Sequence, residues 1–349
     1  MTDRLAGVRL APYTTLRVGG PARAFAEAGS AEELIGLVAG ADRDGEPVLV
    51  LGGGSNLVVA DEGFAGLVVR VRSRGVAVSA EGERVVVTAE AGEDWDALVA
   101  RCVAEGLAGI ECLSGIPGLA GATPIQNVGA YGQEVAQTIT SVRVYDRRAG
   151  TTTVLTPEEC RFGYRHSLFK EDPGRYVVLS VSYALTRSPL STPIAYRELA
   201  AALGVEQGER APLAEVRAAV LELRRRKGMV LDPGDPDTRS AGSFFTNPIL
   251  TREQAAELEL RAPGFPRWDM PDGTVKVPAA WLIENAGFPK GYARGRARIS
   301  TKHTLAITNP SGEATAREVL ALAREIRAGV QEKFGVELVN EPVMVGISL

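Results

Sequence analysis

The chain has 349 residues, of which 45% are hydrophobic and 23% are charged, so its composition is that of a folded protein rather than a disordered one. A chain of this length can bury two or three modest cores. Lys and Arg total 39 against 43 Asp and Glu, and the formal net charge of -4 supplies no overall positive field for a nucleic acid or an anionic membrane surface. Any anionic ligand must therefore meet local donors, and we expect no nucleic-acid partner.

The sequence shows no sign of a leader, a membrane span or a metal cage. Residues 1–10 lack a basic segment that leads into an apolar run, and no stretch approaches the roughly 20 apolar residues that cross a bilayer. The three cysteines have no C-x-x-C spacing, and the only histidines are His166 and His303. We therefore expect a cytoplasmic protein with no membrane insertion, no disulfide framework and no metal site.

Glycines and prolines separate short strand-like and helix-like segments along the whole chain, which is typical of a mixed α and β protein. Ser30 and Glu33 form a capping box that opens a helix near residues 30–41, and an apolar strand at 47–51 ends at a glycine cluster. Three further strands then predict a β meander. The expected strands of this meander and beyond are 67–71, 75–79, 84–89, 141–145, 152–155 and 176–185. The later expected helices are 94–105, 196–203, 213–227 and 314–334.

The first candidate binding motif is L-G-G-G-S-N-L at residues 51–57, directly after the apolar strand. Consecutive glycines let backbone N–H groups converge on an anion, and Ser55 and Asn56 add side-chain donors, so the loop can cradle a phosphate. The motif is not G-x-G-x-x-G and no helical pattern follows it, which disfavours a nicotinamide-type Rossmann site. A plain glycine turn is the alternative that the triplet alone leaves open.

The second candidate motif is the irregular stretch at residues 114–132, which contains five glycines and two prolines. Long irregular stretches in compact domains are usually functional loops. Four residues in it carry side-chain donors, namely Ser114, Thr123, Gln126 and Asn127. So many donors beside so little bulk suit a backbone that lies against a flat polar ring system. A second irregular stretch runs from 228 to 248.

Four isolated side chains have ordinary structural explanations when each is taken alone. Arg165 in F-G-Y-R-H-S resembles a solvated surface charge, and Lys227 complements the end of a helix. Ser243 in A-G-S-F-F-T-N-P is typical of a turn, and Glu341 next to a proline is typical of an exposed edge. No G-x-S-x-G elbow surrounds Ser243, so a Ser/His/Asp hydrolase is disfavoured.

The motifs nevertheless occur together and in a fixed order from about residue 14 to 346. They are T-T-L-R-V-G-G-P-A, L-G-G-G-S-N-L, S-G-I-P-G-x-x-G-A-T-P-I-Q-N-V-G-A-Y-G, F-G-Y-R-x-S, A-G-S-F-F-x-N-P and a closing N-E-P. Each is weak by itself, but six in order are specific. This set resembles the UDP-N-acetylenolpyruvoylglucosamine reductases, flavoenzymes that complete UDP-N-acetylmuramate in bacterial peptidoglycan synthesis.

The resemblance implies an α+β fold with an FAD-binding domain of the vanillyl-alcohol-oxidase (PCMH) type, made of two α+β subdomains, and a separate α+β substrate domain. We expect the first FAD subdomain at residues 1–75, the second at 76–212 and the substrate domain at 213–335. The tail at 336–349 is expected to return to the active site.

The resemblance also implies roles for single residues in the reaction. Ser243 is expected to be the proton donor, and Arg165 and Glu341 are expected to act together on the enolpyruvyl carboxylate. The residue after Arg165 is commonly acidic in these enzymes and is His166 here, so no role is carried over to that position.

Further residues are implied in binding. Tyr196 resembles the tyrosine loop of the longer subtype, which covers the sugar nucleotide, and Lys227 and Asn247 match contacts on the diphosphate side. The expected FAD contacts are Gly53, Gly54, Ser55, Asn56, Leu57, Ser114, Gly115, Ile116, Pro117, Gly118, Ala122, Thr123, Gln126, Asn127, Gly129, Ala130, Tyr131 and Gly132.

The function that follows from the resemblance is the NADPH-dependent, FAD-mediated reduction of UDP-N-acetylglucosamine enolpyruvate to UDP-N-acetylmuramate by a monomer. FAD is expected to be bound non-covalently, since neither glycine loop holds a histidine or cysteine as a tether. Two alternatives stay open at this point. One is another flavoprotein of the same fold that oxidises an alcohol or sugar, and the other is a sugar-nucleotide-binding protein without redox activity.

Overall fold

The computed structural model describes residues 3–349 and divides them into two compact units that interleave along the chain. The first, unit 1, contains the residues up to Val8 together with Ala22–Gly53 and Ala65–Val230. The second, unit 2, contains Arg9–Pro21, Gly54–Phe64 and Leu231–Leu349. The helix at 213–226 lies in unit 1. The expected division into three domains is a finer statement than these two units and stays a prediction.

Unit 1 contains a four-stranded sheet in the order β1-β2-β5-β3. Its strands are β1 (Leu5–Arg9), β2 (Pro21–Ala28), β3 (Val48–Leu51) and β5 (Phe64–Val71). Helix α1 (Ala31–Arg43) packs Leu34 and Val38 into the core beneath this sheet. Ser30 caps α1 by accepting a hydrogen bond from Glu33 N at 3.2 Å, as the sequence predicts, whereas the Glu33 carboxylate accepts from Gly29 N.

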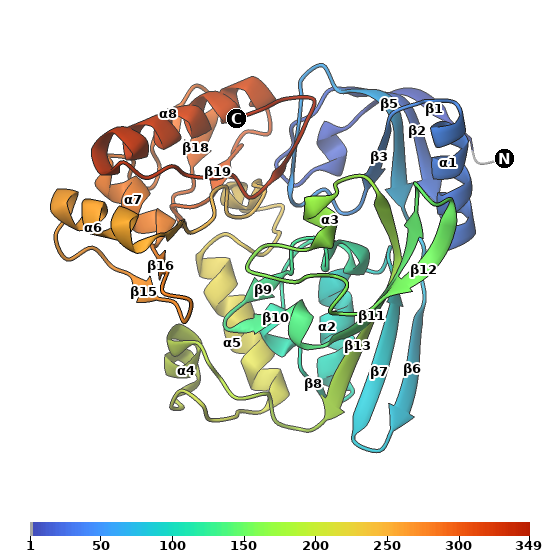
Figure 1. The fold of residues 1–349 in the computed structure, drawn as a ribbon, viewed down its shortest axis with the longest axis horizontal. Helices are drawn as coiled ribbons and strands as arrows, with labels where there is room; N and C mark the ends of the chain where they lie inside the picture. Colours follow the sequence, from blue (N-terminus) through green and yellow to red (C-terminus); the bar gives the residue numbers. More distant parts are fainter. Residues whose placement is uncertain (1–2) are drawn as a thin grey trace. The chain divides into compact units, whose positions relative to one another are not determined.

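A second sheet of unit 1 has six antiparallel strands in the order β12-β11-β13-β7-β6, with β8 also paired to β13 (Figure 1). The strands are β6 (Val76–Glu81), β7 (Arg84–Glu90), β8 (Leu107–Ala108), β11 (Ile139–Asp146), β12 (Thr151–Leu155) and β13 (Tyr176–Arg187). Helix α2 (Trp95–Ala104) packs Trp95, Leu98 and Cys102 into the core of this sheet. The helix predicted at 94–105 is confirmed.

The predicted meander is wrong in its first strand. β5 pairs in parallel with β3 in the four-stranded sheet, while β6 and β7 form an antiparallel pair in the other sheet. The burial of the strands explains the difference. Residues 67–69 of β5 are fully buried, as in a parallel strand covered on both faces, whereas β7 alternates buried and half-buried residues. Sequence spacing shows that each segment is a strand but not which sheet it joins.

Unit 1 is completed by two helices after the second sheet and by short elements in the loops. The helices α4 (Arg197–Leu203) and α5 (Leu213–Arg226) pack against each other around Leu199, Val216 and Val220. The short elements are α3 (Leu168–Glu171), β9 (Gly129–Ala130), β10 (Gln133–Glu134) and the 3-10 helices Glu111–Leu113, Ala120–Ala122 and Val135–Gln137.

Unit 2 has a core built around its last helix, α8 (Ala316–Phe334), which packs against β17, β18 and β19 (Figure 1). Thr315 caps α8, and Gly335 ends it with a φ of 71°, a conformation that glycine adopts without strain. The other elements are β4 (Leu57–Val59), β14 (Ile249–Leu250), α6 (Arg252–Arg261), β15 (Trp268–Asp269), β16 (Val275–Lys276), α7 (Ala279–Asn285), β17 (Ala293–Arg294), β18 (Ala297–Ile299), β19 (Ile307–Thr308), β20 (Val343–Val345) and the 3-10 helices Ala11–Tyr13 and Pro236–Thr238. Within residues 3–349, no helix combines the length and the apolar character that a membrane crossing needs.

The start of α8 is held by a residue more than 250 positions earlier in the chain. The Asp61 carboxylate accepts hydrogen bonds from Ala316 N at 2.7 Å and from Arg317 N at 3.1 Å. These N–H groups have no partner inside the helix, and the positive end of the helix dipole favours the carboxylate there. Asp61 therefore attaches residues 54–64 to the C-terminal core of unit 2.

We expect Asp61→Ala to lower the free energy of unfolding by about 2 kcal/mol, because two N–H groups lose a charged acceptor. Urea unfolding followed by circular dichroism measures this change. Glu62→Ala is the matched control, since Glu62 makes only an exposed ion pair with Arg317 and its loss should leave the midpoint nearly unchanged. Equal midpoints for both variants would show that Asp61 does not stabilise the helix.

Candidate active site

The two glycine loops of unit 1 meet backbone to backbone. A Cβ atom placed on Gly53 would lie 2.8 Å from Gly118 Cα, closer than real Cβ contacts. The start of α2 holds the second loop, because Trp95 N donates to Gly118 O at 3.1 Å and the Asp96 carboxylate accepts from Gly115 N at 2.6 Å. The loops therefore meet at Gly53 and Gly118 with no side chain between them. Main-chain N–H groups without neighbouring side chains are the kind of donor that a diphosphate takes, and we call this contact the cradle.

Gly54, the last glycine of the triplet, lies against the backbone of Tyr13 and Thr14, where the first motif of the chain begins. Gly54 has a φ of 63°, and a Cβ there would collide with the carbonyl oxygen of Tyr13. Thr15 N donates to Gly54 O at 3.1 Å, and the Thr15 hydroxyl donates to Ser240 O at 2.6 Å. Within unit 2, residues 13–15 therefore lie between Gly54 and the loop that carries Ser243.

Three of the four side-chain donors in the loop at 114–132 make hydrogen bonds that fix the path of the loop. The Ser114 hydroxyl donates to Glu111 O at 2.7 Å, and the Thr123 hydroxyl donates to Ala120 O at 2.8 Å. The Asn127 side-chain amide donates to Glu134 at 2.8 Å. These bonds preset the path of the backbone, so the loop would present its shape and its main-chain groups to a ligand.

A buried carboxylate that the sequence reasoning did not single out joins this loop to a distant segment. Glu111 is fully buried and accepts hydrogen bonds from Gly109 N at 2.6 Å and Thr192 N at 2.7 Å, and the Thr192 hydroxyl donates to it at 3.0 Å. Gln133 donates to the same hydroxyl at 2.7 Å and accepts from Cys112 N at 2.8 Å. The network fixes residue 192, four positions before Tyr196. An acid inside the apolar run G-I-E-C-L was the available signal.

Arg165 is part of an ordered turn of unit 1. Gly163 and His166 exchange backbone hydrogen bonds of 3.0 and 3.2 Å, and Arg165 between them has a φ of 50°, an uncommon value for a residue other than glycine. Its guanidinium donates to Gly129 O at 2.8 Å and to Asn127 O at 3.4 Å. Arg165 is therefore held against the loop at 122–132 and is not a mobile surface charge.

Tyr196 and Lys227, both expected to contact the sugar nucleotide, converge on Tyr131. The rings of Tyr131 and Tyr196 pack edge to face with centroids 5.4 Å apart, and Lys227 Nζ lies 5.7 Å from the centre of the Tyr131 ring. Lys227 also pairs with Glu198 at 2.7 Å. Burial raises the pKa of Tyr131 to about 12, so its hydroxyl stays protonated at neutral pH.

Arg224 was also missed by the sequence reasoning. Its Nε atom is buried and has no hydrogen-bond partner in the described part of the chain, and it would lie 3.5 Å from a Cβ on Gly115. Burial lowers the pKa of Arg224 to about 10. The guanidinium also donates from Nη2 to Met229 O at 2.8 Å. A buried Nε–H without an acceptor beside the loop at 114–118 is costly, and an anion bound there would satisfy it.

An ion pair between Arg217 and Asp96 supports the loop at 114–118. Burial favours the neutral form of Asp96, but hydrogen bonds from Arg217 and Gly115 N outweigh it and lower the pKa of the carboxyl. The Arg217 pair is bidentate, with N–O distances of 2.6 and 2.9 Å, and joins α5 to the start of α2.

In unit 2, Ser243 and Glu341 lie on neighbouring backbone segments. Phe245 and Asn340 form an antiparallel bridge, and Glu341 N donates to Phe244 O at 2.9 Å. The chain then continues into β20, which runs parallel to β4, and the Asn56 side chain donates to Glu341 O at 3.4 Å. The tail thus lies beside the residues that follow the glycine triplet.

Asn247, the third residue expected at the nucleotide, lies in the same loop as Ser243. Its side-chain oxygen accepts a hydrogen bond from Ala279 N at 2.9 Å, at the start of α7. This bond leaves the amide N–H₂ of Asn247 as the donor end of the side chain. Ser243 is half-buried and follows Gly242, whose φ is 74°.

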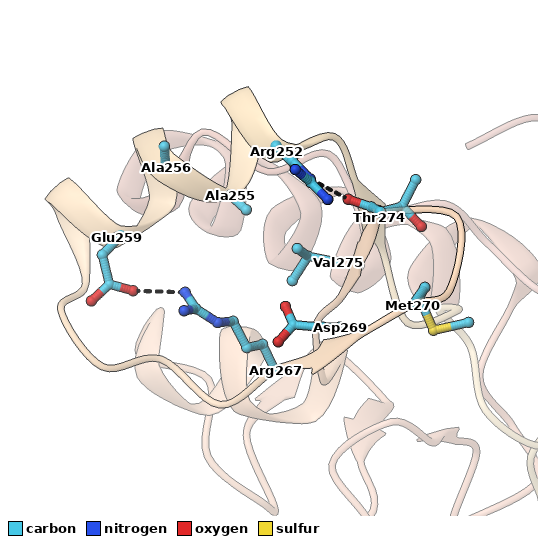
Figure 2. A pocket seen from close by; sticks show the side chains of 10 residues that line it. Arg252, Ala255, Ala256, Glu259, Arg267, Asp269, Met270, Thr274 and Val275 are labelled. Atoms are coloured by element: carbon cyan, nitrogen blue, oxygen red, sulfur yellow. Dashed lines mark hydrogen bonds and ion pairs between the residues drawn. The ribbon is translucent and has the colours of Figure 1, made fainter.

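A separate hollow of about 450 Å³ lies in unit 2 between α6 and the β15–β16 hairpin (Figure 2). Arg267 pairs with Glu259 at 3.2 Å, and Arg252 Nε donates to Gly273 O at 3.2 Å. The ten lining residues include none of the expected site residues. In residues 3–349, no group of three or more His, Cys, Asp or Glu side chains is arranged to hold a metal ion.

Comparison with known proteins agrees with this geometry. Residues 22–156 match the profile of an FAD binding domain, and residues 235–345 match the C-terminal domain of UDP-N-acetylenolpyruvoylglucosamine reductase. The chain is 59% identical to the reductase of that name from Thermobifida fusca, over 98% of both chains. It is 56% identical to the one from Streptomyces coelicolor, over 97% of this chain and 90% of the relative.

A solved structure gives the same result. The crystal structure of UDP-N-acetylenolpyruvylglucosamine reductase from Thermus caldophilus aligns with a TM-score of 0.66 at 30% identity and covers 99% of each chain. The α+β fold with an FAD-binding domain that the sequence predicts is confirmed.

We expect Gly53→Ala to weaken FAD binding about ten-fold or more, since overpacking commonly costs about 1–3 kcal/mol and the new Cβ would meet the Gly118 backbone. Flavin absorbance and fluorescence titration of the apoprotein measure the change. Gly52→Ala is the control, because its Cβ would lie an ordinary 3.8 Å from Leu119 Cδ1. Parental FAD affinity in Gly53→Ala would argue against the contact as part of the FAD site.

Proposed function

The chain belongs to the UDP-N-acetylenolpyruvoylglucosamine reductase family, and we propose that it reduces UDP-N-acetylglucosamine enolpyruvate to UDP-N-acetylmuramate with hydride from NADPH. The protein is an FAD-dependent oxidoreductase of peptidoglycan synthesis. The observation that carries the proposal is the 59% identity to a named reductase over 98% of both chains. The contact without side chains between Gly53 and Gly118 supports the binding of FAD. The chemistry that FAD supplies when bound is the relay of a hydride from NADPH to C3 of the enolpyruvyl group.

The residues of unit 1 and unit 2 supply charge stabilisation and a proton. Hydride addition at C3 places negative charge on C2 and its carboxylate, and Arg165 stabilises such charge with its planar guanidinium. Glu341, in its protonated form, donates a hydrogen bond to the same carboxylate. Ser243 gives its proton to C2, which is basic enough at that stage to accept one from an alcohol. The ordered turn of Arg165 supports the first role, and the backbone pairing of Ser243's loop with the Glu341 segment supports the other two.

Binding of the nucleotide is assigned to three further residues. Lys227 and the amide N–H₂ of Asn247 donate to the diphosphate, and Tyr196 covers the sugar nucleotide. We place the monomeric protein in the cytoplasm, where NADPH is held. Arg224, beside the loop at 114–118, is the donor for FAD that the sequence reasoning did not include.

Anaerobic titration tests the proposed function directly. NADPH should bleach the yellow colour of the FAD-loaded protein, and UDP-N-acetylglucosamine enolpyruvate should restore it with formation of UDP-N-acetylmuramate. Protein that stays yellow with NADPH, or bleached protein that only oxygen or an alcohol-derived acceptor recolours, would contradict the assignment.

We expect Ser243→Ala to leave reduction of the flavin by NADPH nearly intact, because that half-reaction needs no proton donor at carbon. Reoxidation by the enolpyruvyl substrate should slow by about 10² to 10⁴-fold, the usual contribution of a positioned acid. Ser243→Cys keeps an ionisable hydrogen at the same place and should retain more activity. Rapid mixing measures the two half-reactions separately.

Ser240→Ala is the control for this prediction. Ser240 lies in the same loop, where its hydroxyl accepts from Gly242 N at 3.3 Å, so its loss should not affect one half-reaction alone. Equal slowing of both half-reactions in Ser243→Ala would instead indicate that Ser243 only shapes the loop.

A further inference from the structure

Lys227 of unit 1 is held by two groups at once. Its ammonium pairs with the Glu198 carboxylate at 2.7 Å and lies 5.7 Å from the centre of the Tyr131 ring. Lys227 is the C-cap residue directly after α5, and its backbone N–H donates to the last turn of that helix. The side chains of Lys227 and Glu198 are 33% and 41% exposed, so water and small anions reach the pair.

Glu198 lies in the same turn as Tyr196. Tyr196 precedes α4 directly, and Glu198 is in the first turn of that helix. The Tyr196 ring packs on Tyr131, and a Cβ on Gly132 would lie 3.0 Å from Ala195 Cβ, so this turn also lies close against the loop at 122–132. The Lys227–Glu198 pair and the Tyr131–Tyr196 pair therefore fasten one short segment, residues 195–198, at two adjacent points.

A diphosphate that binds to Lys227 must come close to the Glu198 carboxylate. Two anions then compete for one ammonium group, and like charges in contact repel each other. Breaking the ion pair removes one attachment of the turn that carries Tyr196, which the ring contact with Tyr131 and the hydrogen bond from the Gln207 side chain to Ala195 O at 2.8 Å still hold.

We propose that Glu198 is an internal competitor for the diphosphate of the nucleotide substrate. It holds Lys227 in place before the nucleotide binds, and it lowers nucleotide affinity because the ion pair must open first. The inference rests on the proposed function in one respect, the assignment of Lys227 to the diphosphate.

The expected size of the effect follows from the exposure of the pair. Partly exposed ion pairs change an equilibrium by about two- to five-fold, and salt screens them. Glu198→Gln should therefore tighten binding of UDP about two- to five-fold at low ionic strength, and the gain should shrink at high salt.

Isothermal titration of the FAD-loaded protein with UDP tests this. Glu222→Gln is the matched control, because Glu222 pairs with Arg226 at 2.8 Å on α5 and its substitution makes the same charge change near Lys227. Glu198→Ala is a second variant and should shift the affinity in the same direction. An equal gain in Glu222→Gln, or unchanged or weaker UDP binding in both Glu198 variants, would overturn the proposal.

A double-mutant cycle with Lys227→Met shows whether Glu198→Gln changes UDP affinity through Lys227 or only through the overall charge of the protein. The gain from Glu198→Gln should disappear in the Lys227→Met background, and a gain that persists there would overturn the competitor role. Parental UDP affinity in Lys227→Met alone would overturn the assignment of Lys227 as well. The proposed reaction is tested independently by anaerobic bleaching and recolouring of the flavin.

Discussion

The contact between Gly53 and Gly118 is the constraint on which the candidate FAD site of unit 1 depends. The two glycines come from loops that follow different sheets, and their backbones approach too closely for any side chain. The hydrogen bonds that position the loop at 114–118 support this contact. Trp95 N and the Asp96 carboxylate hold it from α2, and Arg217 holds Asp96 from α5.

Buried charges connect this cradle to the residues expected at the nucleotide. Glu111 is satisfied by two backbone N–H groups and the Thr192 hydroxyl, so it ties the first loop residues to the segment before Tyr196. Arg224 instead retains a buried Nε without a partner in residues 3–349. A satisfied buried charge fixes structure, whereas an unsatisfied one is stabilised when an anion binds.

Unit 2 brings the residues expected at its site together through pairings between distant segments. Residues 13–15 contact both the glycine triplet and the loop of Ser243, and the tail lies between that loop and Asn56. Asp61 joins the same short segment to α8. The contacts of Thr15 with Ser240, of Asn56 with Glu341 and of Asp61 with Ala316 each span more than 200 positions. A substitution near residue 15 can therefore disturb the loop of Ser243 without being near it in sequence.

Local sequence was enough to predict several single elements and the order of the motifs. The cap at Ser30 located one helix, and amphipathic spacing located the helices at 94–105 and 314–334, because capping and spacing act within one or two turns. The ordered motifs indicated the family and the α+β fold with FAD. The short elements α7 and β14 to β20 of unit 2 have too few residues to show a period. Helix α6 has 10 residues, but only Ala255 and Leu258 are buried, so its sequence shows little apolar stripe.

Only the tertiary structure decided which strands share a sheet, which donors are used inside a loop, and which charges are buried. β5 lies outside the expected meander because it pairs in parallel with β3. Local spacing within a strand does not identify the strand that pairs with it. The roles of Glu111 and Arg224, and the hold of Glu198 on Lys227, depend on burial and on contacts between distant parts of the chain. Burial and pairing are properties of the packed chain, because the cost of a polar group depends on whether the fold places a partner within hydrogen-bond distance.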